Sequence, residues 1–315
     1  MFEGYRRRDF LLAIVSVFFF GASFPLLKYA LFYLPPLTFA TIRAILTALF
    51  FLTVFPLLGW RFKFPKGAPL RTALIVAFLS TTYPSVAQNY GIMLLEPSSA
   101  ATLSSVFQST SPIFTMFLAA KFLEEPITRK KAFGAAVSFT GIVLLSTGRG
   151  GVEALKSSAT LGGLLILSTA LSYAISGVLI KNTLKEYGAM NLLFWCNIFS
   201  ALMFIPIGGV ILFTEVENPT LTPLGMPMIW LSLLVLSMVV GGVIMIVWYR
   251  LIERYPISRL SYFSYLIPLF SGGIAISMMA EWIDIRTLLF SLLVIIGVYL
   301  VQSPEKARVK IPRST

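Results

Sequence analysis

Long apolar runs separated by short charged or proline- and glycine-containing breaks constrain the fold of this chain more than any other feature. Each run approaches the length of about 20 residues that an α-helix needs to cross a bilayer. Of the 315 residues, 57% are hydrophobic and only 12% are charged, which excludes a soluble globular fold. The sequence therefore predicts an all-α integral membrane protein with ten transmembrane helices. These are expected over about residues 10–32, 36–58, 70–94, 97–120, 130–147, 160–181, 189–213, 227–250, 257–279 and 286–302.

The basic residues predict how the chain is oriented. If the helices alternate in direction, 20 of the 25 Lys and Arg residues fall on the side of the termini. Three fall on the other side (Arg149, Lys156 and Arg286), and Lys28 and Arg43 fall within helices. Basic loops mark the cytoplasmic side. We therefore expect a multi-pass protein of the cell membrane with cytoplasmic N- and C-termini, and no nucleic-acid partner despite the net charge of +12.

The two halves of the chain repeat each other. Pro112, Glu125 and Gly141 recur 156 residues later as Pro268, Glu281 and Gly297. The pattern predicts one repeat over residues 9–147 and a second over 160–303, followed by a cytoplasmic tail over 304–315. Because each repeat holds five helices, the second enters the membrane upside down relative to the first. Such inverted repeats are typical of secondary transporters.

Several segments carry a family resemblance. FGASFPLLK, Arg43, SPIFTMFLAAKFLEEPIT and IPLFSGGIAISMMAEWID resemble the two EamA repeats of the drug/metabolite transporter superfamily. Where that family usually has Gly before the Glu that follows its fourth and ninth helices, this chain has Glu124 and Ala280. The resemblance implies a ten-helix carrier that exports or exchanges small metabolites held centrally between the halves. The substrates of the superfamily range from amino acids to nucleotide sugars and drugs.

The residue inventory argues against an enzyme. The chain has no His, a single Cys (Cys196) and only two Asp residues (Asp9 and Asp284). A serine–histidine intramembrane protease and an enzyme built on paired aspartates are therefore excluded. We expect no metal and no cofactor.

Charged side chains inside a membrane helix are costly and are functional candidates. Lys28 lies near the end of the first predicted helix, where its side chain is expected to reach the interface. Arg43 lies deeper, and two interpretations stay open for it: bridging helices, or holding an anionic group such as a carboxylate. Glu125 and Glu281 are expected to cap the helix that follows each and to pair with bases such as Lys130. We therefore expect transport down a gradient or by exchange, without a titrating membrane carboxylate.

Polar and aromatic side chains within the helices predict the binding site. Amides in hydrocarbon need partners, so Gln88, Asn89, Gln108 and Asn197 are interpreted as hydrogen-bonding a polar solute. With Arg43, they form a candidate substrate site together with Tyr83, Tyr173, Trp195, Trp248, Tyr262 and Tyr265. Pro84, Pro112 and Pro268 are predicted to kink helices that gate this site. Small residues such as Gly134, Ser138, Gly141, Ser291 and Gly297 are expected to pack helices within the monomer.

Together these features predict a secondary transporter that moves small metabolites, amino acids or similar compounds, across the cytoplasmic membrane by alternating access. A lipid-linked sugar flippase or a multidrug exporter of the same fold is the alternative. From another class, a membrane receptor or scaffold that does not transport also stays open. The expected partners are a small-molecule substrate and the lipid bilayer, with the protein a monomer or homodimer.

Overall fold

The computed structural model describes residues 6–60, 62–122, 127–147, 157–214, 222–255, 257–281 and 283–302, and in these ranges it is helical without strands. The unbroken long helices are α1 (Arg7–Tyr33), α2 (Pro36–Leu57), α7 (Arg129–Thr147), α8 (Ser158–Tyr187), α9 (Ala189–Thr214) and α14 (Ile285–Gln302). Other stretches are divided. The first is α3 (Ala68–Ala77), π-helical η1 (Phe78–Thr82) and α4 (Tyr83–Leu94), and the second is α5 (Ala100–Gln108) and α6 (Ser111–Phe122). After the short η3 (Thr222–Gly225) come α10 (Pro227–Leu234), π-helical η4 (Val235–Ile244) and α11 (Met245–Arg254), then α12 (Ile257–Leu260), 3₁₀-helical η5 (Ser261–Leu266) and α13 (Ile267–Met279).

Helix boundaries agree with the expected ranges to within about four residues, with two exceptions: α8 runs to Tyr187, six residues beyond its expected end, and the helix expected over 97–120 is divided. That helix begins at Ala100 and is interrupted at residues 109 and 110. The Ser109 and Thr110 hydroxyls donate to the carbonyls of Val106 and Phe107, both at 2.7 Å. Such local bonds compete with the helical ladder, and Pro112 supplies no N–H to restore it. The interruption therefore has a local cause in the sequence.

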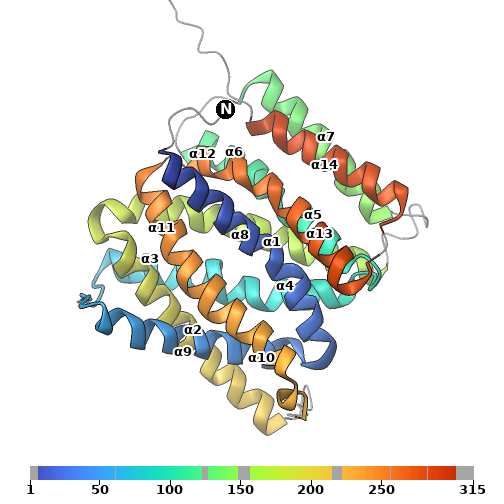
Figure 1. Ribbon diagram of the computed structural model, residues 1–315. Helices are drawn as coiled ribbons and strands as arrows, with labels where there is room; N and C mark the ends of the chain where they lie inside the picture. Colours follow the sequence, from blue (N-terminus) through green and yellow to red (C-terminus); the bar gives the residue numbers. More distant parts are fainter. Residues whose placement is uncertain are drawn as a thin grey trace, which may run out of the picture.

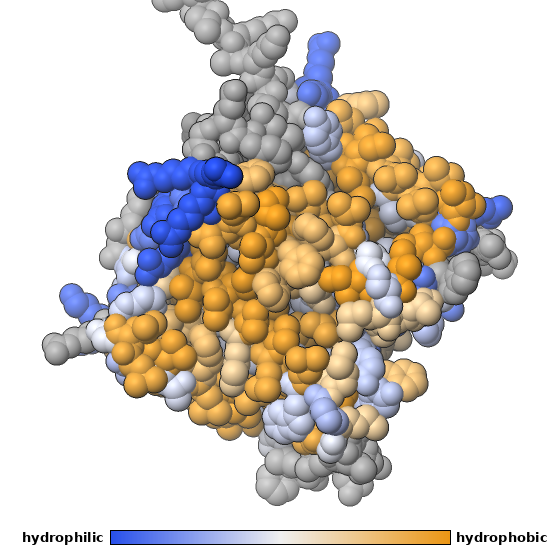
Figure 2. Space-filling view, viewed as in Figure 1, coloured by the Kyte–Doolittle hydropathy of each residue, from blue (hydrophilic) through white to orange (hydrophobic). Residues whose placement is uncertain are grey.

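The outer surface of the molecule is apolar. Within the described ranges, five helical stretches are long and apolar enough to cross a membrane: α1, α2, most of α8, most of α9, and the continuous stretch from α10 to α11. Leu11, Leu52, Leu164 and Leu202 expose half or more of their surface. Figure 2 shows apolar side chains covering most of one face, with hydrophilic side chains gathered near the start of α1. An apolar surface of this extent fits lipid rather than water, so the chain is a multi-pass membrane protein.

Helices from the two halves of the chain pack against each other throughout the molecule. α1 lies along α13, α2 along α9, and α4 along α8, while α7 and α14 form a pair at one edge (Figure 1). Glycines allow the closest of these approaches. A Cβ added at Gly297 of α14 would lie 2.3 Å from the Ser138 nitrogen, and one at Gly141 would lie 2.7 Å from Val294 Cγ2. The expectation that these small residues pack helices within the monomer is confirmed.

Candidate functional site

A cavity of about 300 Å³ lies at the centre of the helix bundle. This volume is at the small end of the range for small-molecule sites. Its walls come from both halves of the chain: α1, α2, η1, α4, α5 and α6, and then α8, α9, η4, α11, α12, η5 and α13. It is therefore the place where a solute would contact both repeats at once.

Different helices contribute most of the polar and most of the apolar side chains of the cavity. Most of the polar ones come from α2, η1, α4, α8 and α9. These are Arg43, Thr47, Ser80, Thr81, Ser85, Gln88, Tyr173, Ser176 and Asn197. The stretches η4–α11 and α12–α13 contribute mainly apolar and aromatic groups. These are Leu236, Val240, Met245, Trp248, Tyr249, Ile252, Ile257, Leu260 and Ile267. The cavity thus suits a solute with one polar end and one apolar end.

Arg43 supplies the charge of the cavity. It lies in the helix α2, and its side chain lines the cavity. The guanidinium makes no ion pair and no hydrogen bond with any described residue. Tyr173 of α8 lies near enough to interact with it electrostatically. Five N–H donors are therefore available to a ligand.

Three of the predicted amides also lie on the cavity wall. Gln88 makes no side-chain hydrogen bond within the described residues, so its amide is free for a solute. Gln108 accepts a bond from the Thr169 hydroxyl at 2.7 Å, which positions the rest of the amide. Asn197 donates to the Leu193 carbonyl one turn back in α9, at 2.8 Å. Amides anchored through one atom can present the other to a ligand.

Six of the predicted site residues line this cavity: Arg43, Gln88, Gln108, Tyr173, Asn197 and Trp248. Three others are placed elsewhere. The Tyr83 hydroxyl bonds with that of Ser168 at 2.6 Å, and Asn89 donates to the Pro36 carbonyl at 2.9 Å. Trp195 donates to the Lys63 carbonyl at 2.9 Å and is not among the lining residues. These three side chains join helices or loops instead of lining the cavity. Tyr262 and Tyr265 belong to η5, and their side chains lie outside the described part of the structure.

Irregular helix segments line the cavity in both halves. Ser80 and Thr81 belong to the π-helical η1, and Leu236, Val240 and Gly241 to the π-helical η4. π-Helical turns are uncommon and concentrate at functional sites. The predicted kink residues lie next to breaks of this kind: Pro84 is at the start of α4 after η1, while Pro112 and Pro268 are the second residues of α6 and α13. Their role in gating stays a prediction.

An ion pair with a buried carboxylate lies at one end of α1. Lys28 Nζ of α1 lies 2.7 Å from Glu281 Oε1, and the Glu281 side chain has no exposed surface. Glu281 also accepts bonds from the Ala101 N–H at 3.0 Å, the Thr102 N–H at 3.3 Å and the Thr102 hydroxyl at 2.7 Å. Lys28 donates in addition to the Pro97 carbonyl at 2.5 Å. The network joins α1, the start of α5 and the end of α13, just beyond the cavity residue Leu27.

This network bears on two expectations. Lys28 is not a cation without a protein partner, because the buried Glu281 carboxylate and the Pro97 carbonyl bind its ammonium group. Glu281 caps α5 in the other half of the chain and pairs with Lys28, whereas α14 is capped by Asp284, whose carboxylate accepts from the Arg286 N–H at 2.6 Å. Ala280, with φ of 49°, turns the chain so that Glu281 points inward. Glu125 lies outside the described residues.

A second ion pair lies at the opposite end of α1. The carboxylate of Asp9, itself buried, accepts bonds from Arg254 Nη1 at 3.1 Å and from the Tyr255 hydroxyl at 2.8 Å. Asp9 and Lys28 are 19 residues apart on one helix, which corresponds to roughly 28 Å at 1.5 Å per residue. This separation is close to the thickness of the hydrocarbon core. The two ionic contacts therefore lie near opposite faces of the membrane.

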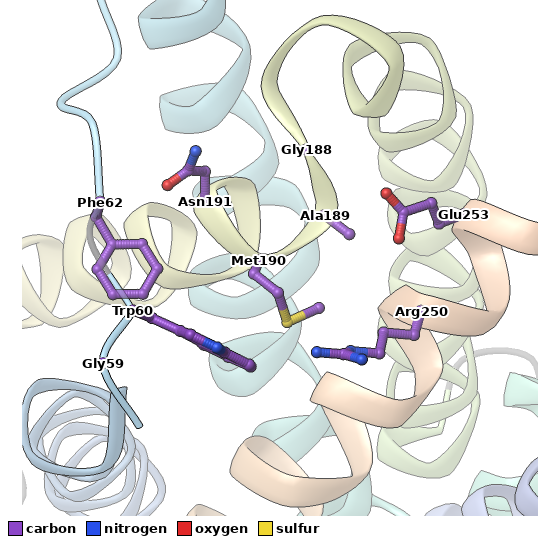
Figure 3. Close-up of a pocket in the computed structure, with 9 residues that line it drawn as sticks. All are labelled: Gly59, Trp60, Phe62, Gly188, Ala189, Met190, Asn191, Arg250 and Glu253. Carbon is purple, nitrogen blue, oxygen red and sulfur yellow. The ribbon is translucent and has the colours of Figure 1, made fainter. Parts of the chain in front are cut away.

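A second hollow, of about 540 Å³, opens on the surface between the α2–α3 connection, the start of α9 and the end of α11. Figure 3 shows Trp60, Met190 and Arg250 converging there. The Arg250 guanidinium carbon lies 5.6 Å from the Trp60 ring centre, so that cation is already partnered by a ring. Glu253 and Arg250 are both exposed to solvent. The central cavity, with the unpaired Arg43 guanidinium and the free Gln88 amide, is the stronger candidate site.

The comparisons with known proteins agree with this architecture. Residues 8–147 and 160–303 each match the EamA-like transporter family, so the chain belongs to that family and is a transporter, not an enzyme. A relative from Salmonella typhimurium, named a probable amino-acid metabolite efflux pump, is 26% identical over 302 residues, covering 93% of this chain and 94% of the relative. An uncharacterized transporter from Archaeoglobus fulgidus is 27% identical over 310 residues, covering 93% and 98%. One solved crystal structure shares the fold, with a TM-score of 0.66 at 15% identity and coverage of 94% and 96%.

Proposed function

We propose that the protein is an alternating-access carrier that exports or exchanges small organic metabolites, amino acids or similar compounds, across the cell membrane. The observation that carries this proposal is the cavity between the two halves, lined by Arg43, Gln88 and Asn197. The relative from Salmonella typhimurium named for amino-acid metabolite efflux supports the substrate class. A lipid-linked flippase is less well supported, because the relative from Salmonella typhimurium is named for amino-acid metabolite efflux.

The proposed architecture is ten spans arranged as two inverted repeats, residues 9–147 and 160–303. Support comes from reciprocal packing. If α1 corresponds to α8 and α6 to α13, the contact of α1 with α13 is answered by that of α8 with α6. If α4 likewise corresponds to α11, the contact of α4 with α8 has its equivalent in the contact of α11 with α1. Two further contacts, α2 with α9 and α7 with α14, join a helix to its own counterpart in the other half. Such exchange of partners is expected for halves related by a pseudo-two-fold axis.

The proposed mechanism uses the two ends of α1 in turn. We place both termini in the cytoplasm, on the strength of the basic residues on that side. The Lys28–Glu281 network then closes the outer end, and the Asp9–Arg254 contact lies at the inner end. Breaking the outer network while the inner helices close would expose the cavity to the other side. The irregular segments η1 and η4 lie in the helices that would have to bend.

The test is uptake of labelled amino acids by proteoliposomes that hold the purified protein and the same compounds inside. Wild-type protein is expected to accumulate one or more of them. Asn197→Ala should lower uptake about tenfold, because a ligand hydrogen bond in a dry site is lost. Asn191→Ala is the matched control: Asn191 also lies on α9 and also donates to a carbonyl one turn back, but it is outside the cavity. Equal effects of the two substitutions, or no uptake by wild type, would contradict the proposal.

A further inference from the structure

The described residues that line the central cavity give it a positive charge and no negative one. Among its described lining residues, Arg43 is the ionisable charge and no Asp or Glu is present. The buried carboxylates of Asp9 and Glu281 are engaged in the ion pairs at the two ends of α1. A solute in the cavity therefore faces a positive group without a negative one.

The Arg43 guanidinium also differs from two other half-buried cations of the described residues, Lys28 and Lys181. Lys28 is bound by Glu281 and the Pro97 carbonyl, and Lys181 donates to the carbonyls of Ile252 and Tyr255 at 2.6 and 3.2 Å. These contacts account for both lysines structurally. Arg43 makes no such contact with the described residues. A charged group that is withdrawn from bulk water and lacks a protein partner is costly, so its position favours a ligand of opposite charge.

The side chains of the cavity restrict the chemical class of that ligand further. A carboxylate offers two oxygens that match the planar fork of a guanidinium. A dianion such as a phosphate ester would leave one negative charge unbalanced in a poorly solvated site, since a single guanidinium neutralises one charge. The apolar wall of Met245, Trp248, Ile252 and Leu260 would receive a hydrophobic or aromatic body.

We propose that the cargo is an amphipathic monocarboxylate, that Arg43 is the residue that binds its carboxylate, and that solutes with a net positive charge are rejected. This inference rests on the proposed transport function and refines its substrate class. An α-ammonium group is tolerated, because hydroxyl and amide oxygens such as those of Ser80 and Gln88 can accept from it, but it is not required. Amino acids and their 2-oxo acid analogues thus belong to one substrate class, whereas amino-acid amides and other cations do not.

Three compounds with the same aromatic body test the proposal: phenylalanine, phenylpyruvate and phenylalanine amide. The measurements are competition for uptake in proteoliposomes and, separately, the rise in the unfolding temperature of the purified protein on ligand binding. We expect the two carboxylates to compete and stabilise at concentrations about tenfold or more below the amide. Arg43→Gln should weaken both carboxylates by about tenfold or more and remove this preference, the size expected for losing charge-assisted bonds. Arg71→Gln, at an exposed position, is the control and should change nothing.

Arg43→Lys is a second variant that keeps the test informative if Arg43→Gln does not fold. It keeps the charge but loses the planar fork, so an intermediate preference for carboxylates is expected. Equal competition by the amide in wild type, or an unchanged carboxylate preference in Arg43→Gln, would overturn the inference while leaving transport itself established. Failure of all three compounds to bind or to compete for a transported substrate would also overturn it. Absence of transport of any compound would contradict the proposed function instead.

Discussion

Substitutions in the Lys28–Glu281 network are predicted to lower stability and to loosen the outer end together. Removing one partner of a buried ion pair costs about 3 to 5 kcal/mol, because the other charge is left uncompensated. Glu281→Gln should be near the lower figure, since the amide oxygen can keep part of the bonding to Ala101 and Thr102. Lys28→Met should cost less, about 2 kcal/mol, because the remaining carboxylate still accepts three bonds from α5.

The double variant separates the ion pair from the other contacts. With both charges removed, no uncompensated charge remains, so the combined loss should be smaller than the two single losses added together. The expected coupling free energy is about 1 to 2 kcal/mol, measured by a double-mutant cycle on unfolding in detergent. The same variants should let an impermeant maleimide reach a cysteine at Leu27 faster from outside, in a background where Cys196 is replaced by Ala. A coupling below about 0.5 kcal/mol together with an unchanged labelling rate would refute the reasoning.

Two further substitutions test the packing and the inner end. Gly297→Ala should destabilise the protein by about 1 to 3 kcal/mol in thermal unfolding, because its Cβ would lie 2.3 Å from the Ser138 nitrogen. The control Gly209→Ala meets nothing within 4 Å and should be neutral or slightly stabilising, and a similar loss at both sites would contradict the packing argument. Asp9→Asn should cost only about 1 kcal/mol, less than Glu281→Gln, because the Arg254 side chain is 53% exposed and screened by water. The reverse order of the two losses in the same unfolding assay would count against this account of the two ends.

The helix ranges could be predicted because hydropathy and short charged breaks act locally along the chain. The interruption of the helix expected over 97–120 was missed, although the signal was present in Ser109 and Thr110, whose hydroxyls compete for backbone carbonyls. A continuous apolar run concealed it.

The site was only partly predictable for a different reason. A polar side chain inside a span must find a partner, but the sequence does not say whether the partner is a ligand or a neighbouring helix. Arg43 and Asn197 line the cavity. Asn89 instead donates to the Pro36 carbonyl, and Trp195 donates to the Lys63 carbonyl. The Glu281 contact with Lys28 spans 253 residues, and its inward turn depends on the positive φ of Ala280. Neither feature has a local sequence signal.

Counterflow at equal pH on both sides of proteoliposomes tests the central claim most directly. Vesicles preloaded with unlabelled phenylalanine are diluted into a trace of labelled phenylalanine, without a pH, sodium or electrical gradient. Label is expected to accumulate transiently above the equilibrium level, because a carrier whose cavity opens alternately to each side exchanges cargo one for one. Accumulation that requires an imposed pH gradient would contradict exchange without a titrating carboxylate. Absence of accumulation under every gradient, for phenylalanine and for the other amino acids, would contradict the carrier itself.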